Sequence, residues 1–292
     1  MTAKTRKWQA LIAFLLLLLS LSCIIPLWLV ASISFTDEAA IVKNGYSLIP
    51  SQFSTDAYAT IFSGGKQVWR SYGISVFITI AGTIAHVAVT GMAGYSLANP
   101  SVRYRNGLAM FFFITMVFNG GMVPWYMICK TFGFMENIWA LLIPNLVFSP
   151  FNLFLVRNYM RDIPHALIES ARLDGANDAY IALRIYFPLS KPILATVALF
   201  AAIGYWNDWW NSIMLVSDVN LYPVQYLLMK LKSDINMMKN LQSSGFAGAA
   251  AMKPAESLQM ATVVITVAPI LLFYPFLQKY IVKGLVIGSV KG

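Results

Sequence analysis

Six long stretches of this sequence are almost free of charged side chains, and they constrain the fold more than any other feature. A helix needs about 20 mostly apolar residues to cross the hydrocarbon core of a membrane. Because backbone polar groups in lipid must be bonded within the chain, and because these runs lack the alternation of barrel strands, each is predicted to be a transmembrane helix. The stretches cover approximately residues 11–34, 72–99, 108–129, 138–156, 193–216 and 260–277.

The amino-acid composition supports this interpretation. Hydrophobic residues make up 58% of the 292 residues, and charged residues make up only 11%. Soluble domains carry about 25% charged residues, and so few charges could not cover so much apolar surface in water. The chain is therefore predicted to be an all-α integral membrane protein with six transmembrane helices.

The first apolar stretch has an alternative interpretation. Lys4, Arg6 and Lys7 precede it, as in a secretory signal peptide, and residues 20–23 (Ser-Leu-Ser-Cys) loosely resemble a lipoprotein processing site. The run is longer than a typical signal-peptide core and has no small-x-small cleavage motif. We therefore expect an uncleaved helix over 11–34, with removal of this segment as the alternative.

Topology accounts for the net charge of +9. With both termini in the cytoplasm, the inner segments hold 13 lysines and arginines against four acidic residues, and the outer segments hold eight of each. This positive-inside bias indicates contact with anionic membrane lipid and needs no nucleic acid. The predicted parts are a cytoplasmic tail (1–10), the first helix (11–34), an extracytoplasmic segment (35–71), a five-helix domain (72–280) and a cytoplasmic tail (281–292).

The sequence contains few ionisable side chains within the predicted spans and lacks the common catalytic, metal-binding and phosphate-binding motifs. Within the spans the ionisable side chains are His86 and Asp208, whereas ion-driven pumps usually keep several. His86 is expected to bond neighbouring helices, and Cys23 and Cys129 to pack as small apolar residues. No phosphate loop, zinc motif or nucleophile elbow occurs. We expect no catalytic residue, metal or cofactor. If the chain transports a solute, the energy would therefore come from a partner.

The inner loop over 157–191 carries the clearest local pattern, which predicts two short helices. Asp162 can cap the first helix, and Glu169 and Arg172 lie one turn apart and can pair. Gly175 supplies a helix stop. Asn177 or Asp178 can cap the second helix, which Pro188 closes, and its predicted apolar stripe consists of Ala176, Ala179, Tyr180, Leu183 and Phe187.

Two interpretations of this helix pair are open. It can lie in the membrane interface, as amphipathic inner-face helices often do, or its apolar side can enter a cleft on a soluble partner.

The order of residues favours the second interpretation. Residues 169–175 read Glu-Ser-Ala-Arg-Leu-Asp-Gly and, after nine further residues, residues 185–188 read Ile-Tyr-Phe-Pro. This order and spacing resembles the EAA signature of ABC-importer permeases. Ser170 replaces the family's Ala, and Phe187 replaces its Leu. The Leu-Asp-Gly-Ala run at 173–176, the C-terminal end and the six-span layout are similar to the carbohydrate branch. The resemblance is greatest to the maltose-type six-helix subunit, in the polysaccharide and complex-oligosaccharide group that includes alginate and aldouronate importers.

This resemblance implies a type I ABC importer permease in a bacterial cytoplasmic (inner) membrane, a multi-pass subunit and not an enzyme. Its partners would be a sister permease, a homodimeric ABC ATPase that holds ATP and Mg, and an extracytoplasmic substrate-binding protein. The outer loop 217–259 would contact the binding protein, and the tail from Lys283 the ATPase. The coupling helix seated in the ATPase would use Glu169, Ser170, Ala171, Asp174, Gly175, Ala176, Ile185 and Pro188.

Two other classes remain as alternatives. An ion-coupled secondary carrier would work alone, and a sugar-lipid transferase would need an acidic or metal-binding cluster at the end of a span.

Side chains suited to sugars gather in the third, fourth and fifth spans. Aromatic faces stack on sugar rings, and amides bond hydroxyl groups. The alternative is that the aromatic residues form interface belts and that the asparagines bridge helices. The candidates for the substrate path are Asn119, Trp125, Tyr126, Asn145, Asn152, Tyr205, Trp206, Asn207, Asp208, Trp209 and Asn211.

Overall fold

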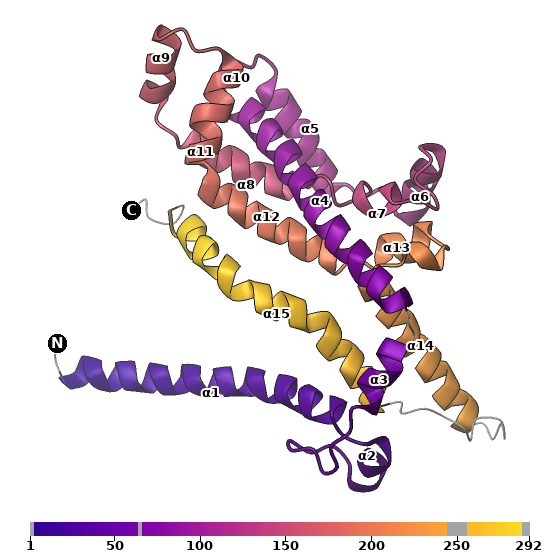
Figure 1. Ribbon diagram of the computed structural model, residues 1–292. Helices are drawn as coiled ribbons and strands as arrows, with labels where there is room; N and C mark the ends of the chain where they lie inside the picture. The colour runs from indigo at the N-terminus through magenta and orange to yellow at the C-terminus, as the bar shows by residue number, and fades with distance from the viewer. Residues whose placement is uncertain (1–2, 64–65, 244–255, 288–292) are drawn as a thin grey trace. The chain divides into compact units, whose positions relative to one another are not determined.

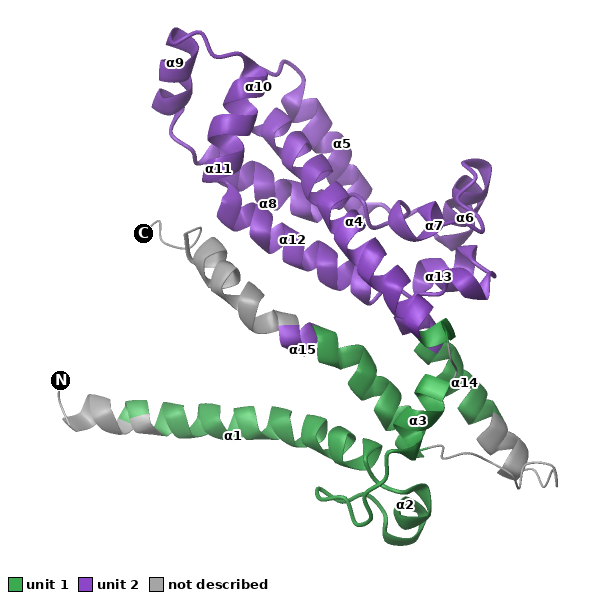
Figure 2. Cartoon of the chain, in the orientation of Figure 1, with its two compact units in different colours: residues 1–68, 228–269 green, residues 69–227, 270–292 purple. Residues whose placement is uncertain are grey.

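The computed structural model describes residues 3–63, 66–243 and 256–287. The regular secondary structure in these ranges is helical, apart from one isolated β-bridge between Thr36 and Phe53 (Figure 1). The chain divides into two compact units (Figure 2). The first comprises residues 1–68 and 228–269, and the second comprises residues 69–227 and 270–292.

The first unit contains α1 (Ala3–Ser34), α2 (Glu38–Asn44) and α3 (Asp56–Ser63). Residues 11–34 of α1 form an unbroken apolar helix of membrane length. Most of its large side chains are exposed, as expected of a helix that faces lipid. The prediction of a helix at 11–34 is therefore confirmed.

The segment after α1 is held together by aromatic packing and by a helix cap. The Phe35 ring stacks on Phe53 and Tyr58, with centroid separations of 5.6 and 4.8 Å. The Asp37 side chain accepts hydrogen bonds from the backbone N–H groups of Ala39 and Ala40, and so caps α2. This short segment therefore has a defined structure of its own.

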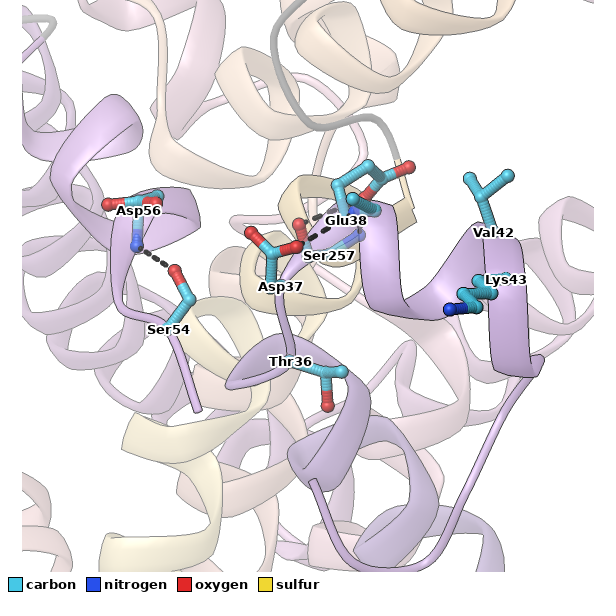
Figure 3. A pocket seen from close by; sticks show the side chains of 9 residues that line it. Thr36, Asp37, Glu38, Val42, Lys43, Ser54, Asp56 and Ser257 are labelled. Atoms are coloured by element: carbon cyan, nitrogen blue, oxygen red, sulfur yellow. Dashed lines mark hydrogen bonds between the residues drawn. The ribbon is translucent and has the colours of Figure 1, made fainter. Parts of the chain in front are cut away.

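A carboxylate in this segment caps a helix far away in the sequence. Glu38 accepts hydrogen bonds from the backbone N–H of Glu256 at 3.0 and 3.1 Å. It also accepts from the N–H and the Oγ of Ser257, at 3.0 and 3.1 Å (Figure 3). These two residues begin α15 (Glu256–Ile287), whose first N–H groups have no partner inside the helix. The contact lies at the edge of a pocket of about 550 Å³. Glu38 therefore fixes where α15 starts.

The second unit is built around α4 (Lys66–Ala98), α5 (Arg105–Val117), α8 (Pro150–Arg161) and α12 (Lys191–Trp206). Helix α8 packs against both α5 and α12 (Figure 1). Val156 and Val197 are fully buried in the cluster between α8 and α12. A Cβ on Gly94 would lie 2.6 Å from Val156, so this glycine permits the close approach of α4 to α8.

Some predicted spans are confirmed and others are interrupted. Helix α4 confirms the span predicted at 72–99, and α15 covers the span predicted at 260–277. Two described helices are long and apolar enough to cross a membrane, or four if each bent helix pair counts as one span. The count of six helices therefore stays a prediction.

Each of the spans predicted over 108–129, 138–156 and 193–216 is divided into two helices. The first is divided into α5 and α6 (Met122–Thr131), which are bent by 118°. The second is divided into α7 (Trp139–Leu142) and α8, and the third into α12 and α13 (Trp210–Leu215). Positive φ angles of 88° at Gly121 and 64° at Asn145 mark the first two breaks. Short polar segments therefore interrupt these apolar runs.

Replacing Glu38 by alanine should loosen the start of α15. Loss of a helix cap costs about 1 kcal/mol, or roughly a fivefold shift in a local opening equilibrium. We expect faster amide hydrogen exchange at Glu256 and Ser257 in the purified protein, measured by mass spectrometry. Glu38→Gln, which keeps an acceptor oxygen, should retain most of the protection. Equal exchange in wild type and Glu38→Ala would disprove the capping role.

Candidate functional site

The inner loop forms two helical arms joined by a glycine turn. The first arm is α9 (His165–Leu173), and Gly175 follows it with a φ of +84°. The N–H of Gly175 donates to the carbonyl of Arg172 at 3.0 Å, and the N–H of Ala176 donates to the carbonyl of Ala171 at 2.9 Å. This pair of bonds is the Schellman helix ending, which needs a left-handed residue that glycine adopts without strain. The predicted helix stop at Gly175 is confirmed.

The second arm starts with a cap and continues through a widened turn. Asn177 Oδ1 accepts a hydrogen bond from the N–H of Tyr180 at 2.8 Å, which confirms Asn177 as the cap of α10 (Asp178–Ile181). A π-helical turn follows over Ala182–Tyr186, and α11 (Phe187–Leu189) contains Pro188. Proline has no N–H and crowds the carbonyl four residues earlier, so a wider turn accommodates its ring. Pro188 thus ends the arm, and α12 departs from it at 78°.

The charges of the loop pair differently from the prediction. Arg172 donates to Asp178 at 3.2 Å, which ties α9 to the second arm, and to Ser101 Oγ at 2.9 Å, which ties α9 to the segment between α4 and α5. The predicted pairing of Arg172 with Glu169 is therefore wrong, because Arg172 reaches across the turn and not back along its own helix. Glu169 is exposed and makes no hydrogen bond or ion pair with any residue that the structure describes. Asp162, predicted to cap α9, instead follows the end of α8.

The base of the two arms is part of the protein core. Ile168, Ile181 and Tyr186 are buried in the same cluster as Val156 of α8 and Val197 of α12. Ala171 and Ala176 pack against this cluster, and burial raises the pKa of Tyr186. Movement of the arms is therefore coupled mechanically to α8 and α12.

The outer side of the arms is apolar and uncovered. Leu173 is 89% exposed, Leu183 is 64% exposed and Tyr180 is 55% exposed. The prediction of one apolar stripe is therefore only partly right, since Tyr180 and Leu183 are exposed whereas Ala176 and Phe187 pack against the buried cluster. Leu173 was missed as a site residue, although its place just before the helix stop is a signal for exposure.

A hollow of about 590 Å³ lies between the arms and gathers most of the predicted coupling residues. Glu169 and Pro188 do not line it. Its walls combine backbone at the glycine turn, a carboxylate, small side chains and an aromatic ring, so its shape suits a protruding apolar or basic side chain of another protein. The predicted residues that line it are Ser170, Ala171, Asp174, Gly175, Ala176 and Ile185.

The two aromatic segments of the predicted substrate path meet in space. Trp125 of α6 and Trp210 of α13 have ring centroids 6.5 Å apart, and the Trp209 ring lies 5.8 Å from that of Trp210. Trp209 is exposed, and Trp125 is partly exposed. Trp125, Trp209 and Trp210 therefore form one aromatic surface, although Trp125 is far from the other two in the sequence. Of the other candidates, Asn119 and Asn145 are exposed, and Tyr126, Asn207 and Asp208 are partly exposed.

Four path candidates are instead enclosed: Asn152, Tyr205, Trp206 and Asn211 are each at most 8% exposed. The Tyr205 hydroxyl donates to the carbonyl of Leu142 at 2.8 Å. Asn211 Nδ2 donates to the carbonyl of Pro144 at 2.9 Å. Asn152 Nδ2 lies 3.0 Å from His86 Nε2. In this conformation all four side chains are buried within the protein and have no access to a ligand.

His86 completes this arrangement. Its Nδ1 lies 2.6 Å from the carbonyl of Leu146, and its Nε2 lies 3.0 Å from Nδ2 of Asn152. Because a carbonyl only accepts, Nδ1 carries the proton and Nε2 accepts from the amide. Residues 142–146, the break between α7 and α8, thus have three carbonyls bonded by side chains of α4, α12 and α13. The prediction that His86 bonds between helices is confirmed.

Replacing Tyr205 by phenylalanine should destabilise this break. A buried carbonyl left without its donor costs about 1–3 kcal/mol, and each kcal/mol lowers the melting temperature by roughly 2–4 °C in a domain of this size. The measurement is the apparent melting temperature of the purified protein. Tyr126→Phe is the matched control, since the Tyr126 hydroxyl makes no hydrogen bond to a described residue. An unchanged melting temperature in Tyr205→Phe would contradict the role of this bond.

Comparison with known proteins agrees with the geometry. The family described as "Binding-protein-dependent transport system inner membrane component" matches residues 58–287. The polygalacturonan/rhamnogalacturonan transport system permease protein YtcP of Bacillus subtilis is 36% identical over 289 residues, which cover 99% of this chain and 100% of that protein. Protein LplC of Bacillus subtilis is 37% identical over 270 residues, covering 92% and 90%.

A solved structure extends the comparison to three dimensions. The crystal structure of a bacterial ABC transporter involved in the import of the acidic polysaccharide alginate contains a chain that superposes with a TM-score of 0.82 at 29% identity. The match covers 96% of this chain and 98% of that chain. The resemblance inferred from residues 169–188 is thus confirmed, and the chain belongs to the family of binding-protein-dependent transport system inner membrane components.

Proposed function

We propose that this chain is one permease subunit of an ATP-driven importer and forms half of the path for an oligosaccharide delivered by an extracytoplasmic binding protein. The family membership and the names of its relatives support this proposal. The observation that carries it is the glycine-bent knuckle, residues 165–189, whose base is buried and whose outer side is apolar. In this proposal the chain is not an enzyme, and ATP and Mg bind to the partner ATPase.

The knuckle has the surface needed for docking on a soluble subunit. Leu173, Tyr180 and Leu183 are exposed apolar side chains, and burying them gains about 25 cal/mol per Å² of apolar area. Leu173 is at the end of α9 and Tyr180 is in α10, so the two arms contribute to one interface. ATP-driven closure of the ATPase would then move α12, which leaves the knuckle directly. Alternation between inward-facing and outward-facing states follows from that movement.

The substrate path in this proposal uses the accessible members of the aromatic surface. Trp125, Tyr126 and Trp209 offer ring faces, and Asn119 and Asn145 offer amides. Sugar rings stack on such faces and bond such amides. A sister permease would supply the other half of the path.

The remaining partners and the orientation follow from the family. The inner-membrane location, the cytoplasmic termini and the knuckle on the cytoplasmic side belong to the proposal, as does contact of the outer loop 217–259 with the binding protein. Residues 244–255 of that loop and 288–292 of the C-terminal tail lie outside the described residues. An ion-coupled carrier is disfavoured because His86 already bonds through both ring nitrogens.

Replacing Gly175 by alanine should impair the coupling between the ATPase and uptake. A Cβ at Gly175 would meet nothing within 4 Å, so Gly175→Ala acts only through its left-handed φ of +84°, at about 1–2 kcal/mol. We expect uptake, and ATP hydrolysis stimulated by loaded binding protein, to fall roughly 5- to 30-fold. Gly175→Asn should be milder because asparagine tolerates this conformation.

Gly107→Ala is the matched control, because Gly107 also has open space around its Cβ position but lies within α5. Its activity should equal that of wild type. A second variant combines Leu173→Asp with Leu183→Asp. The docking proposal fails if both this variant and Gly175→Ala still co-purify with the ATPase in full amount and show full uptake.

A further inference from the structure

Three arginines that belong neither to the knuckle nor to the aromatic surface lie where α5 begins and α8 ends. Arg105 is the first residue of α5, and Arg157 and Arg161 lie one turn apart at the end of α8. Helix α5 packs against α8. Burial, followed by the positive charges of Arg161 and Arg105, lowers the pKa of Arg157. The three guanidinium groups therefore repel one another.

This cluster lacks a counterion within the described part of the chain. None of the three guanidinium groups forms an ion pair or a hydrogen bond with a described residue. The Nε of Arg157 is buried without a partner, and the guanidinium lies 5.7 Å from the centroid of the Phe154 ring. A buried donor without an acceptor costs free energy, and like charges add to that cost. An anion from outside the chain would remove both costs, because it would accept a hydrogen bond from the buried donor and neutralise the like charges.

The surroundings of the cluster indicate the kind of anion. Helix α5 continues from Arg105 with an exposed apolar surface that includes Leu108, Phe111 and Ile114. Tyr104 is 69% exposed, with the Arg103 guanidinium 5.5 Å from its ring centroid. Exposed tyrosine and arginine beside an apolar helix face are typical of the headgroup level of a membrane. In the orientation of the proposed function this level is the cytoplasmic leaflet, which holds anionic lipid.

We propose that Arg105, Arg157 and Arg161 bind the headgroup phosphate of an anionic phospholipid of the cytoplasmic leaflet, with its acyl chains along α5. Arginine donates in a planar fork that matches two phosphate oxygens, so the three side chains can bond one headgroup from several directions. The lipid neutralises a cluster that would otherwise hold α5 and α8 apart. Only the choice of leaflet rests on the proposed function.

The test measures lipid retained by the purified complete importer, without reference to uptake. The protein is reconstituted with equal amounts of phosphatidylglycerol and phosphatidylcholine, re-extracted, and analysed by native mass spectrometry. Wild type should retain phosphatidylglycerol in preference. The triple variant R105Q/R157Q/R161Q should retain less by roughly fivefold for each arginine. R157K, which keeps the charge but loses the fork, should give an intermediate value.

A control of equal charge change separates a site from general attraction. R70Q/K66Q/K130Q removes three cations that are remote in sequence from the cluster, and it should leave retention unchanged. If the triple variant does not assemble, R161Q alone is used, because Arg161 is exposed and its loss disturbs packing least.

Several outcomes overturn the proposal. They are equal retention of phosphatidylglycerol by wild type and the arginine variants, equal retention of both lipids, and full displacement of phosphatidylglycerol by millimolar inorganic phosphate, which would indicate a free-anion site. Burial of the three arginines against acidic residues of a partner subunit would also overturn it. The experiment measures retained lipid and does not depend on transport. If the proposed function is wrong, the result on lipid binding therefore still stands, and only the assignment of the leaflet is lost.

Discussion

Backbone polar groups without water decide how this chain can interrupt its apolar runs. In lipid an open N–H or carbonyl is costly, and irregular backbone is tolerated only where other groups bond it. The break at residues 142–146 meets this condition because Tyr205, Asn211 and His86 each bond one of its carbonyls. Three helices thus stabilise one short non-helical segment, and the exposed Asn145 stands within it at a φ of 64°.

The same requirement explains why these side chains are polar. An apolar residue at the position of Tyr205, His86 or Asn211 would pack as well but would leave a carbonyl without a donor. Gly82 has its own part in this arrangement, because a Cβ there would lie 2.2 Å from the Tyr205 ring. Candidates for sugar binding on the basis of residue type can therefore have a structural role instead, and burial separates the two groups.

Local sequence predicted what is determined locally. The long helices predicted at 11–34 and 72–99, the stop at Gly175 and the cap at Asn177 each depend on residues a few positions apart. The break in the fourth predicted span escaped prediction, because its bonding partners lie about 60 residues away, as Tyr205 does from Leu142. The pairing of Arg172 with Asp178 was missed for a similar reason: helix spacing indicates neighbours on one helix and not across a turn.

Helix α12 connects the knuckle with the helix break at residues 142–146, the two features on which the proposed transport function depends. It leaves the knuckle at 78°, and near its other end the Tyr205 hydroxyl bonds the break that displays Asn145. A helix of 16 residues spans about 24 Å and resists bending over that length. A displacement of the knuckle therefore cannot be absorbed within α12 without breaking its hydrogen bonds, and it must appear at Tyr205 and the carbonyl of Leu142. The hydrogen bond from Tyr205 to the carbonyl of Leu142 is thus also the point at which, in the proposed function, force from the knuckle would reach the substrate path.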